Sequence, residues 1–260
     1  MDTTPPKDTA RGAAVRAEGL GVAGARGWAF RHLGLAAGPG ALIALTGPSG
    51  SGRTSALLAL TGRMRTSAGH AEVAGLRLPR QMSAVRRVSA LAHVPGVSEL
   101  DPALTVAEHL RERALLDRRF GGSPLTLLRP RRERTAAARA RIDAAMKVSG
   151  LEAGALPKGL RTSVRDLERL ETLRLSVALA LIGRPRLLAL DDVDLKLSDT
   201  EREQAWAMLR AVAAGGTTVL AVCSQAPDGA VVVSTAERPE AEANENEEGA
   251  DDAGTEAGRA

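Results

Sequence analysis

Three short runs of hydrophobic residues stand out along the chain, each bounded by glycine, proline or charged residues. They lie within residues 41–45, 187–190 and 216–223. Each run holds at least four consecutive apolar positions, and such runs are typical of strands that are buried on both faces of a parallel sheet. A helix-forming stretch, 54–60, follows the first run after a glycine-rich turn. The pattern therefore predicts an α/β fold with a mostly parallel sheet.

The long stretch between the first and second hydrophobic runs is predicted to contain helices. Thr105 is followed three residues later by Glu108, which is the spacing of a capping box at a helix start. Residues 136–147 are rich in alanine and arginine and favour a helix by propensity. After the second run, residues 201–209 predict another helix, and we expect its Trp206 to face the core.

The glycine-rich turn matches the phosphate-binding P-loop motif G-x-x-x-x-G-K-[ST], except that arginine replaces the motif's lysine. Its glycines allow sharp bends that bring backbone N–H groups close to an anion, and the following helix directs its positive end to the same point. The alternative is a Gly/Ser turn without a ligand, but the flanking strand and helix are what phosphate binding requires. The residues predicted to bind nucleotide are Gly47, Pro48, Ser49, Gly50, Ser51, Gly52, Arg53, Thr54 and Ser55.

Arg53 alters the chemistry of this loop. Lysine is a compact point charge on a flexible stem, whereas arginine is a longer planar fork that keeps its proton. Arginine can pair with phosphate oxygens, even in a bidentate manner. The arginine side chain fits poorly in a pocket that is shaped for one ammonium group between two phosphates. We therefore expect weakened nucleotide affinity and a displaced γ-phosphate.

Two carboxylates, Asp191 and Asp192, follow the second hydrophobic run directly. Ligands of open α/β sheets bind at the carboxyl ends of the strands, and carboxylate oxygens are good ligands for Mg²⁺. Thr54 occupies the hydroxyl position of the P-loop motif, which also serves the metal ion. The sequence therefore predicts that Thr54 and Asp191 hold the Mg²⁺ of a bound nucleotide, Asp191 usually through water.

Composition restricts the compartment. Cys223 is the one cysteine among 260 residues, so an intramolecular disulfide is impossible, which suits a reducing cytoplasm. No apolar run approaches the roughly 20 residues that a membrane-spanning helix needs. The first residues lack the apolar centre of a signal peptide. We therefore expect a cytoplasmic location.

Charge is distributed unevenly along the chain. Residues 237–260 contain nine acidic residues and two arginines, although the whole chain has a net charge of +4. Few of these residues are apolar, and we expect both this tail and residues 1–12 to be disordered. The remainder is basic, with arginines concentrated over 111–141. That region is either a solvated helical face or a surface for anionic lipid or an acidic partner. Nucleic-acid binding is not expected, because no aromatic residues are interleaved to stack on bases.

Four motifs, taken in order, resemble those of the nucleotide-binding subunits of ABC transporters. They are GPSGSGRTS (47–55), LTVAEHL (104–110), RPRLLALDD (184–192) and GTTVLAV (216–222). The resemblance covers roughly residues 15–236 and implies a RecA-like P-loop NTPase core with an inserted helical subdomain. It also implies ATP and Mg²⁺ as cofactors, a homo- or heterodimer of cassettes, and an integral membrane permease as partner, with the cassette peripheral at the inner face of the membrane. The implied limits are a cassette over 13–236, with a core lobe of about 13–97 and 165–236 and a helical lobe of about 98–164.

The resemblance assigns roles to three further residues. The position of the family's catalytic glutamate is Asp192, which is one methylene shorter and reaches less far toward a water molecule. The family's switch histidine falls at Ser224, which has no imidazole. The aromatic residue that stacks on adenine is best matched by Trp28. Its spacing is a few residues late, and the alternative is a core residue.

Two further family motifs are altered. Gly96 stands where a glutamine helps to sense Mg²⁺ and couples to the membrane partner. Residues 167–171 stand where the family carries its LSGGQ signature, which binds the γ-phosphate held by the opposite subunit. Glu168 and Glu171 would repel a phosphate, and Arg169 would offset part of that repulsion.

Three functions remain open from the sequence. In the first, the chain is an ATPase subunit of an ABC transporter that hydrolyses ATP slowly. Alternatively, it is a degenerate cassette that regulates or docks on a membrane protein. The third reading is another P-loop enzyme, such as a nucleotide or small-molecule kinase. The two-lobe order of motifs and the 216–222 strand argue against the kinase.

Overall fold

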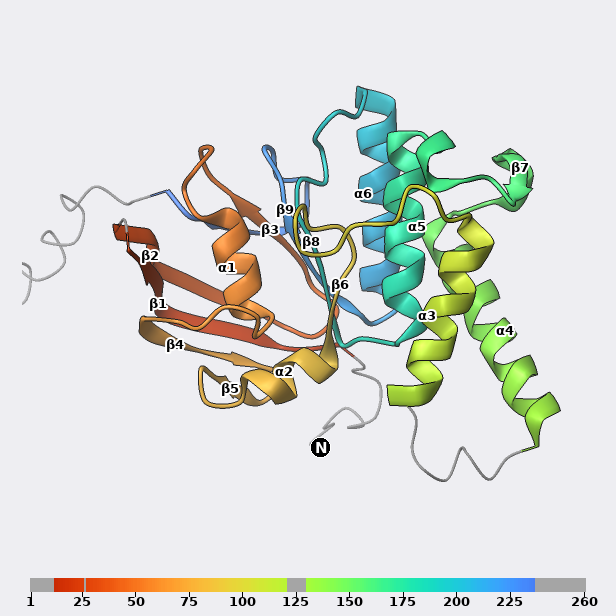
Figure 1. The fold of residues 1–260 in the computed structure, drawn as a ribbon. Coiled ribbons are helices and arrows are strands. Elements are labelled where there is room, and N and C mark those ends of the chain that lie inside the picture. Colours follow the sequence, from red (N-terminus) through yellow and green to blue (C-terminus); the bar gives the residue numbers. More distant parts are fainter. Residues whose placement is uncertain (1–11, 26, 121–129, 237–260) are drawn as a thin grey trace, which may run out of the picture.

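The computed structural model describes residues 12–25, 27–120 and 130–236, which form two sheets and a group of helices (Figure 1). The tails for which we expect disorder lie outside the described residues, apart from Gly12. The limits of the two lobes remain a prediction.

The first sheet is parallel and has five strands in the order β10-β3-β9-β8-β6. The residues of β8 and β9 are all buried, as the continuous apolar runs predict. The predicted α/β P-loop fold with parallel strands is therefore confirmed. The strands are β3 (Leu42–Thr46), β6 (Ser89–Leu91), β8 (Leu187–Leu190), β9 (Thr218–Val222) and β10 (Val231–Ser234).

The second sheet is antiparallel, has the order β2-β1-β4-β5, and is not anticipated by the sequence pattern. The pairing of β1 with β2 shifts register at several points, and these irregularities break the alternation of buried and exposed residues. The resulting pattern lacks the period of two by which half-buried strands are recognised. The strands are β1 (Val15–Gly24), β2 (Gly27–Ala37), β4 (Ala68–Val73) and β5 (Leu76–Leu78).

Helix α1 (Arg53–Leu60) lies between the two sheets (Figure 1). Its Leu57 and Leu60 are fully buried in a core that also includes Leu20 of β1 and Ile43 of β3. This packing fixes the start of α1 relative to the end of β3. Helix α2 (Met82–Val88) connects β5 to β6.

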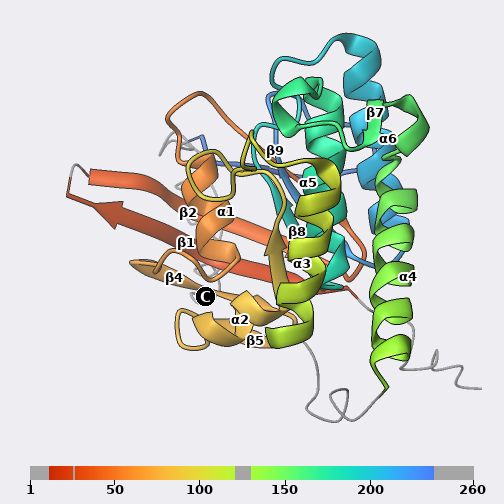
Figure 2. The same cartoon turned by 45° about the vertical axis from the view of Figure 1, so that its right-hand side comes forward.

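Helices α5 (Arg169–Ile182) and α6 (Asp199–Ala214) form a second core with β3, β6, β8 and β9. Trp206 of α6 is buried in it, as predicted. Helices α3 (Val106–Phe120) and α4 (Arg131–Ser149) pack beside α5 and form a third core with it (Figure 2). The short strand β7 (Pro157–Leu160) follows α4.

The predicted capping box at the start of α3 is present. The backbone N–H of Thr105 donates to Glu108 Oε2 at 2.7 Å, and the backbone N–H of Glu108 donates to Thr105 Oγ1 at 3.3 Å. The Thr105 hydroxyl also donates to Glu108 Oε2 at 2.7 Å, and the bonds from the Thr105 N–H and hydroxyl lower the pKa of Glu108. Among the described helices, none combines the length and apolar character that crossing a membrane requires.

Leu188→Ala tests the core between the parallel sheet and α5 and α6. Leu188 is fully buried in β8, so the change leaves a cavity and is expected to lower the free energy of unfolding by about 3 kcal/mol. Urea denaturation followed by circular dichroism measures the loss. The matched control is Leu115→Ala, because Leu115 is 59% exposed on α3 and should cost less than about 0.5 kcal/mol. Equal losses in the two variants would contradict the assigned core.

Candidate functional site

The loop between β3 and α1 is bent by three glycines. Gly47, Gly50 and Gly52 have φ values of 146°, 83° and 80°, a region that favours glycine. A Cβ on Gly52 would lie 2.1 Å from the carbonyl oxygen of Ala29, so no larger residue fits there. The loop therefore has the backbone conformation in which successive N–H groups can converge on an anion.

The N-terminus of α1 differs from those of α5 and α6. Gly52 is its N-cap and supplies no side-chain hydrogen bond, and its first turn contains no acidic residue. By contrast, α5 and α6 both begin with complete capping boxes that use carboxylates. The first N–H groups and the positive dipole end of α1 are therefore left for a ligand or solvent.

The P-loop is attached to the end of β10. The hydroxyl groups of Ser51 and Thr235 lie 2.6 Å apart, and Thr235 Oγ1 donates to the carbonyl of Thr46 at 3.2 Å. A Cβ on Gly47 would come within 2.7 Å of both hydroxyl oxygens. These contacts fix the loop between two neighbouring strands.

The guanidinium of Arg53 is directed to the end of β9. Its Nη1 donates to the carbonyl oxygen of Cys223 at 3.1 Å. Arg53 is half-buried, and the residue it contacts is almost fully buried. Arg53, which stands at the motif's lysine position, is therefore hydrogen-bonded to a backbone carbonyl of its own chain.

Thr54 and Asp191 come together as predicted for metal ligands, although their role as ligands stays a prediction. Thr54 Oγ1 donates to Asp191 Oδ2 at 2.6 Å, and the Asp192 N–H donates to Asp191 Oδ1 at 3.0 Å. Asp191 is 3% exposed. Burial raises its pKa, and the bond from Thr54 opposes the rise. A buried carboxylate beside a hydroxyl, at the edge of the P-loop, is a donor set that fits Mg²⁺.

Asp192 is half-buried and has a φ of 49°, a left-handed conformation that is uncommon for residues other than glycine. Its carbonyl oxygen accepts a hydrogen bond from Arg169 Nη2 at 3.3 Å. Burial lowers the pKa of Arg169, and the nearby charge of Asp192 opposes that lowering. The predicted catalytic carboxylate therefore lies close to a cation of its own chain.

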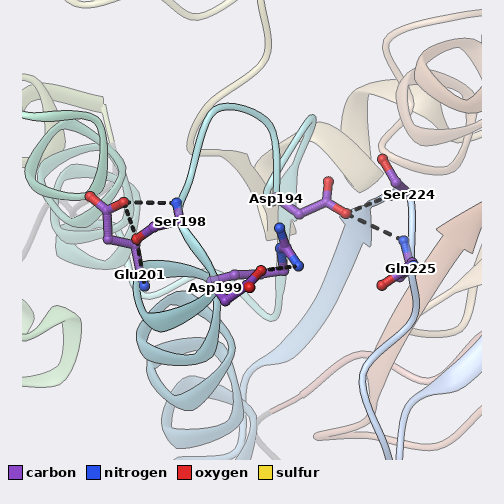
Figure 3. Close-up of polar contacts among 7 residues, drawn as sticks. Asp194, Ser198, Asp199, Glu201, Ser224 and Gln225 are labelled. Carbon is purple, nitrogen blue, oxygen red and sulfur yellow. Dashed lines mark hydrogen bonds and ion pairs between the residues drawn. The ribbon is translucent and has the colours of Figure 1, made fainter.

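Ser224 is exposed just after β9 and is held through its backbone. Its N–H donates to Asp194 Oδ2 at 2.7 Å, and the Gln225 N–H donates to the same oxygen at 3.3 Å (Figure 3). Asp194 is not among the site residues predicted from the sequence. The available signal was a third carboxylate in the loop after β8, at the edge where the parallel strands end.

The segment that stands in place of the LSGGQ signature caps its own helix. Glu168 is the N-cap of α5, and its N–H donates to Glu171 Oε2 at 2.9 Å, while the side chain of Glu168 accepts from the N–H of Glu171. Arg169 Nη1 lies 3.0 Å from His93 Nε2, in the loop after β6. Burial, and then the charge of Arg169, lower the pKa of His93.

Trp28, the predicted adenine-stacking residue, is 48% exposed on β2, so the core alternative is wrong. The next residue, Ala29, has its carbonyl oxygen against Gly52 of the P-loop. Trp28 therefore lies on the strand that runs beside the loop. Whether it stacks on a base stays a prediction.

Gly96 occupies a tight turn after β6. Its φ of 72° favours glycine, and its N–H donates to Glu99 Oε1 at 2.7 Å. Backbone bonds from Val97 and Ser98 to Val94 close the same turn. A local turn therefore replaces the glutamine that the resemblance leads one to expect.

Residues 30–194 match the sequence profile of the ABC transporter family. The Nod factor export ATP-binding protein I of Cupriavidus pinatubonensis is 32% identical over 182 residues, which are 70% of this chain and 49% of that protein. The daunorubicin resistance ATP-binding protein DrrA2 of Streptomyces coeruleorubidus is 32% identical over 213 residues, 80% of this chain and 58% of that protein. The chain thus spans about half the length of the curated relatives it matches.

Solved cassettes share the fold. The ATP-binding cassette MJ0796, in a dimeric post-hydrolysis state with ADP and Pi, is 20% identical with a TM-score of 0.60, covering 82% of this chain and 88% of that one. The cbiO1 protein of Clostridium perfringens, part of the cbiONQ complex, is 16% identical with a TM-score of 0.64, covering 81% and 78%. The chain belongs to the ABC transporter family and has the fold of its ATP-binding cassettes.

Proposed function

We propose that the chain is the ATP-binding subunit of an ABC-type transport complex and binds Mg-ATP at the edge where β3, β8 and β9 end. One observation carries the proposal. The glycine-rich loop and the uncapped end of α1 lie beside the Thr54–Asp191 pair, so anion and cation ligands meet at one place. The phosphates would lie against residues 47–55, with Thr54 and Asp191 holding Mg²⁺. The bound metal supplies a divalent charge next to the phosphate oxygens.

Hydrolysis at this site is expected to be slow. Arg53 Nη1 is engaged by the Cys223 carbonyl, and turning this group toward a phosphate costs that hydrogen bond. Asp192 is the remaining candidate for the general base, but its side chain is one methylene shorter than glutamate and reaches less far toward a water molecule. Ser224 has no group that can replace an imidazole. Losing one transition-state contact typically costs about 10²–10³ in rate, and several losses need not add.

The alternative proposal is a regulatory or docking cassette with little turnover. The self-capped start of α5 favours it, because Glu168 and Glu171 satisfy N–H groups of the helix start that stands in place of the signature. Their negative charges also repel a phosphate from another subunit. In a homodimer, both composite sites would carry this change.

The partner surface belongs to the same proposal. A cavity of about 530 Å³ lies between β6, α3 and α5, beside the turn that holds Gly96. Three arginines (Arg63, Arg86 and Arg113) and one carboxylate (Glu99) line it together with the exposed Val97, so its lining is mainly cationic. Burial, and then the charge of Arg86, lower the pKa of Arg63 to about 10, so the cation remains protonated at neutral pH.

A permease segment with acidic and apolar side chains would fit this cavity. That partner would place the cassette at the inner face of the membrane. The cassette itself would pair as a homo- or heterodimer. Nucleic acid is not an expected partner.

Arg53→Lys tests the altered loop. We expect the variant to bind Mg-ATP about tenfold more tightly, because the compact ammonium suits the space between two phosphates. Calorimetric titration measures the affinity, and phosphate release measures turnover. Arg77→Lys, at an exposed position of β5, is the matched control and should change neither. Equal affinity and turnover in Arg53→Lys and the unaltered protein would show that arginine at this position does not weaken nucleotide binding.

Asp192→Asn separates the enzyme from the docking module. If Asp192 is the general base, turnover of radiolabelled ATP above background falls by about 10²-fold or more, while ATP affinity is kept. Asp199→Asn removes a carboxylate from the first turn of α6 and should leave turnover unchanged. Absence of turnover in the unaltered protein would favour the docking alternative.

Asp191→Asn is expected to move stability and binding in opposite directions. The amide oxygen can accept from the Asp192 N–H and the amide nitrogen can donate to the Thr54 hydroxyl, so both contacts are kept without a buried charge and the free energy of unfolding rises. The same change removes the dependence of ATP affinity on Mg²⁺. Urea denaturation and titrations with Mg²⁺ or with a chelator measure the two effects. A destabilised variant that keeps its response to Mg²⁺ would be the opposite outcome.

A further inference from the structure

The segment Cys223–Gln225, directly after β9, is held by charged side chains from two different loops. We call it the switch segment. On one side, Asp194 accepts the N–H groups of Ser224 and Gln225 through a single oxygen (Figure 3). On the other side, Arg53 of the P-loop donates to the carbonyl of Cys223. One anion and one cation thus act on three consecutive residues.

The two contacts are not equivalent to ordinary strand pairing. The switch segment lies beyond the end of β9, and Ser224 and Gln225 are exposed. Exposed amides without such a partner would bond to water. Asp194 is half-buried, and a carboxylate acceptor makes a stronger hydrogen bond than a neutral one. The loop after β8 therefore fixes the loop after β9.

We propose that Asp194 is a positioning residue that forms, with Arg53, a two-sided latch on the switch segment. The latch links the P-loop to the residue that stands in place of the family's switch histidine. Its consequence rests on the proposed function. A triphosphate at the P-loop competes with the Cys223 carbonyl for Arg53, which removes one of the two charged contacts on the segment and leaves that of Asp194. Occupancy of the P-loop is thereby transmitted to Ser224.

The environment of Cys223 agrees with this arrangement. The thiol is 1% exposed, and its pKa is raised to about 12, mainly by burial and further by the charge of Asp194, while Arg53 opposes the rise. Both latch residues therefore lie close enough to the end of β9 to act on it electrostatically. If Asp194 alone held the segment 223–225, its conformation would not depend on Arg53.

Amide hydrogen exchange of Ser224 and Gln225 tests the latch in the full chain without nucleotide. Asp194→Ala is expected to accelerate exchange of both amides about tenfold, the loss of a charge-assisted bond. Asp194→Asn retains an uncharged acceptor and should give a smaller increase, and its closer shape guards against misfolding of the alanine variant. Asp199→Ala is the matched control: its carboxylate pairs with Arg202 at 3.1 Å, and the two amides should exchange as in the unaltered protein. Unchanged exchange in both Asp194 variants would overturn the proposal.

Arg53→Met decides whether the latch has two sides. Arg53 contacts neither amide. If Asp194 alone holds the segment, both exchange rates in Arg53→Met stay unaltered, whereas the two-sided latch predicts an increase of about threefold. If the rates do not change, Asp194 acts alone and the two-sided latch is wrong.

Inorganic tripolyphosphate, added to the unaltered protein, should raise exchange toward the Arg53→Met value and have no further effect on that variant. Calorimetric binding of tripolyphosphate without this rise overturns the transmission of occupancy. Absence of any calorimetric binding instead contradicts the proposed function, and the Asp194 and Arg53 variants still decide the latch.

Discussion

The register of the parallel strands β3, β9 and β8 is the constraint on which the site depends. Leu45 pairs with Val222, and Leu190 pairs with Ala221, so the three strands end at one level. The residues that follow these ends are therefore neighbours, although they are far apart in sequence. Thr54 thus meets Asp191, Arg53 meets Cys223, and Asp194 meets Ser224. Because each strand contributes to two of these contacts, a shift of any one strand would separate two of the three.

The N-termini of the helices differ in whether side chains of the chain satisfy their backbone N–H groups. At α5 and α6, carboxylates of the chain itself occupy the helix N-termini, and these ends offer little to an added anion. At α1, no side chain does so. The start of α1 therefore leaves N–H groups without a side-chain partner, whereas the start of α5, in the segment that replaces the signature, is capped by carboxylates. This asymmetry links the two functional proposals, since it favours nucleotide binding and disfavours composite sites between subunits.

Sequence patterns reveal features that depend on neighbours along the chain. The buried strands β8 and β9 follow from continuous apolar runs, and the start of α3 follows from Thr105 and Glu108. The strands β1 and β2 do not follow, because irregular pairing disrupts their alternation. In the site, the Thr54–Asp191 contact follows from the motif and the sheet edge. Two other contacts do not follow from the sequence: the bond from Arg53 to the Cys223 carbonyl and the bonds from two amides to Asp194. They depend on how loops that are distant in sequence meet in space, which no local pattern encodes.

Equilibrium binding of Mg-ATP to the full chain, followed by calorimetry, tests the central claim most directly. The account predicts saturable heat with one site per chain, reduced when a chelator removes Mg²⁺. No saturable heat with adenine or guanine triphosphates at millimolar concentration would contradict it and would leave only the fold.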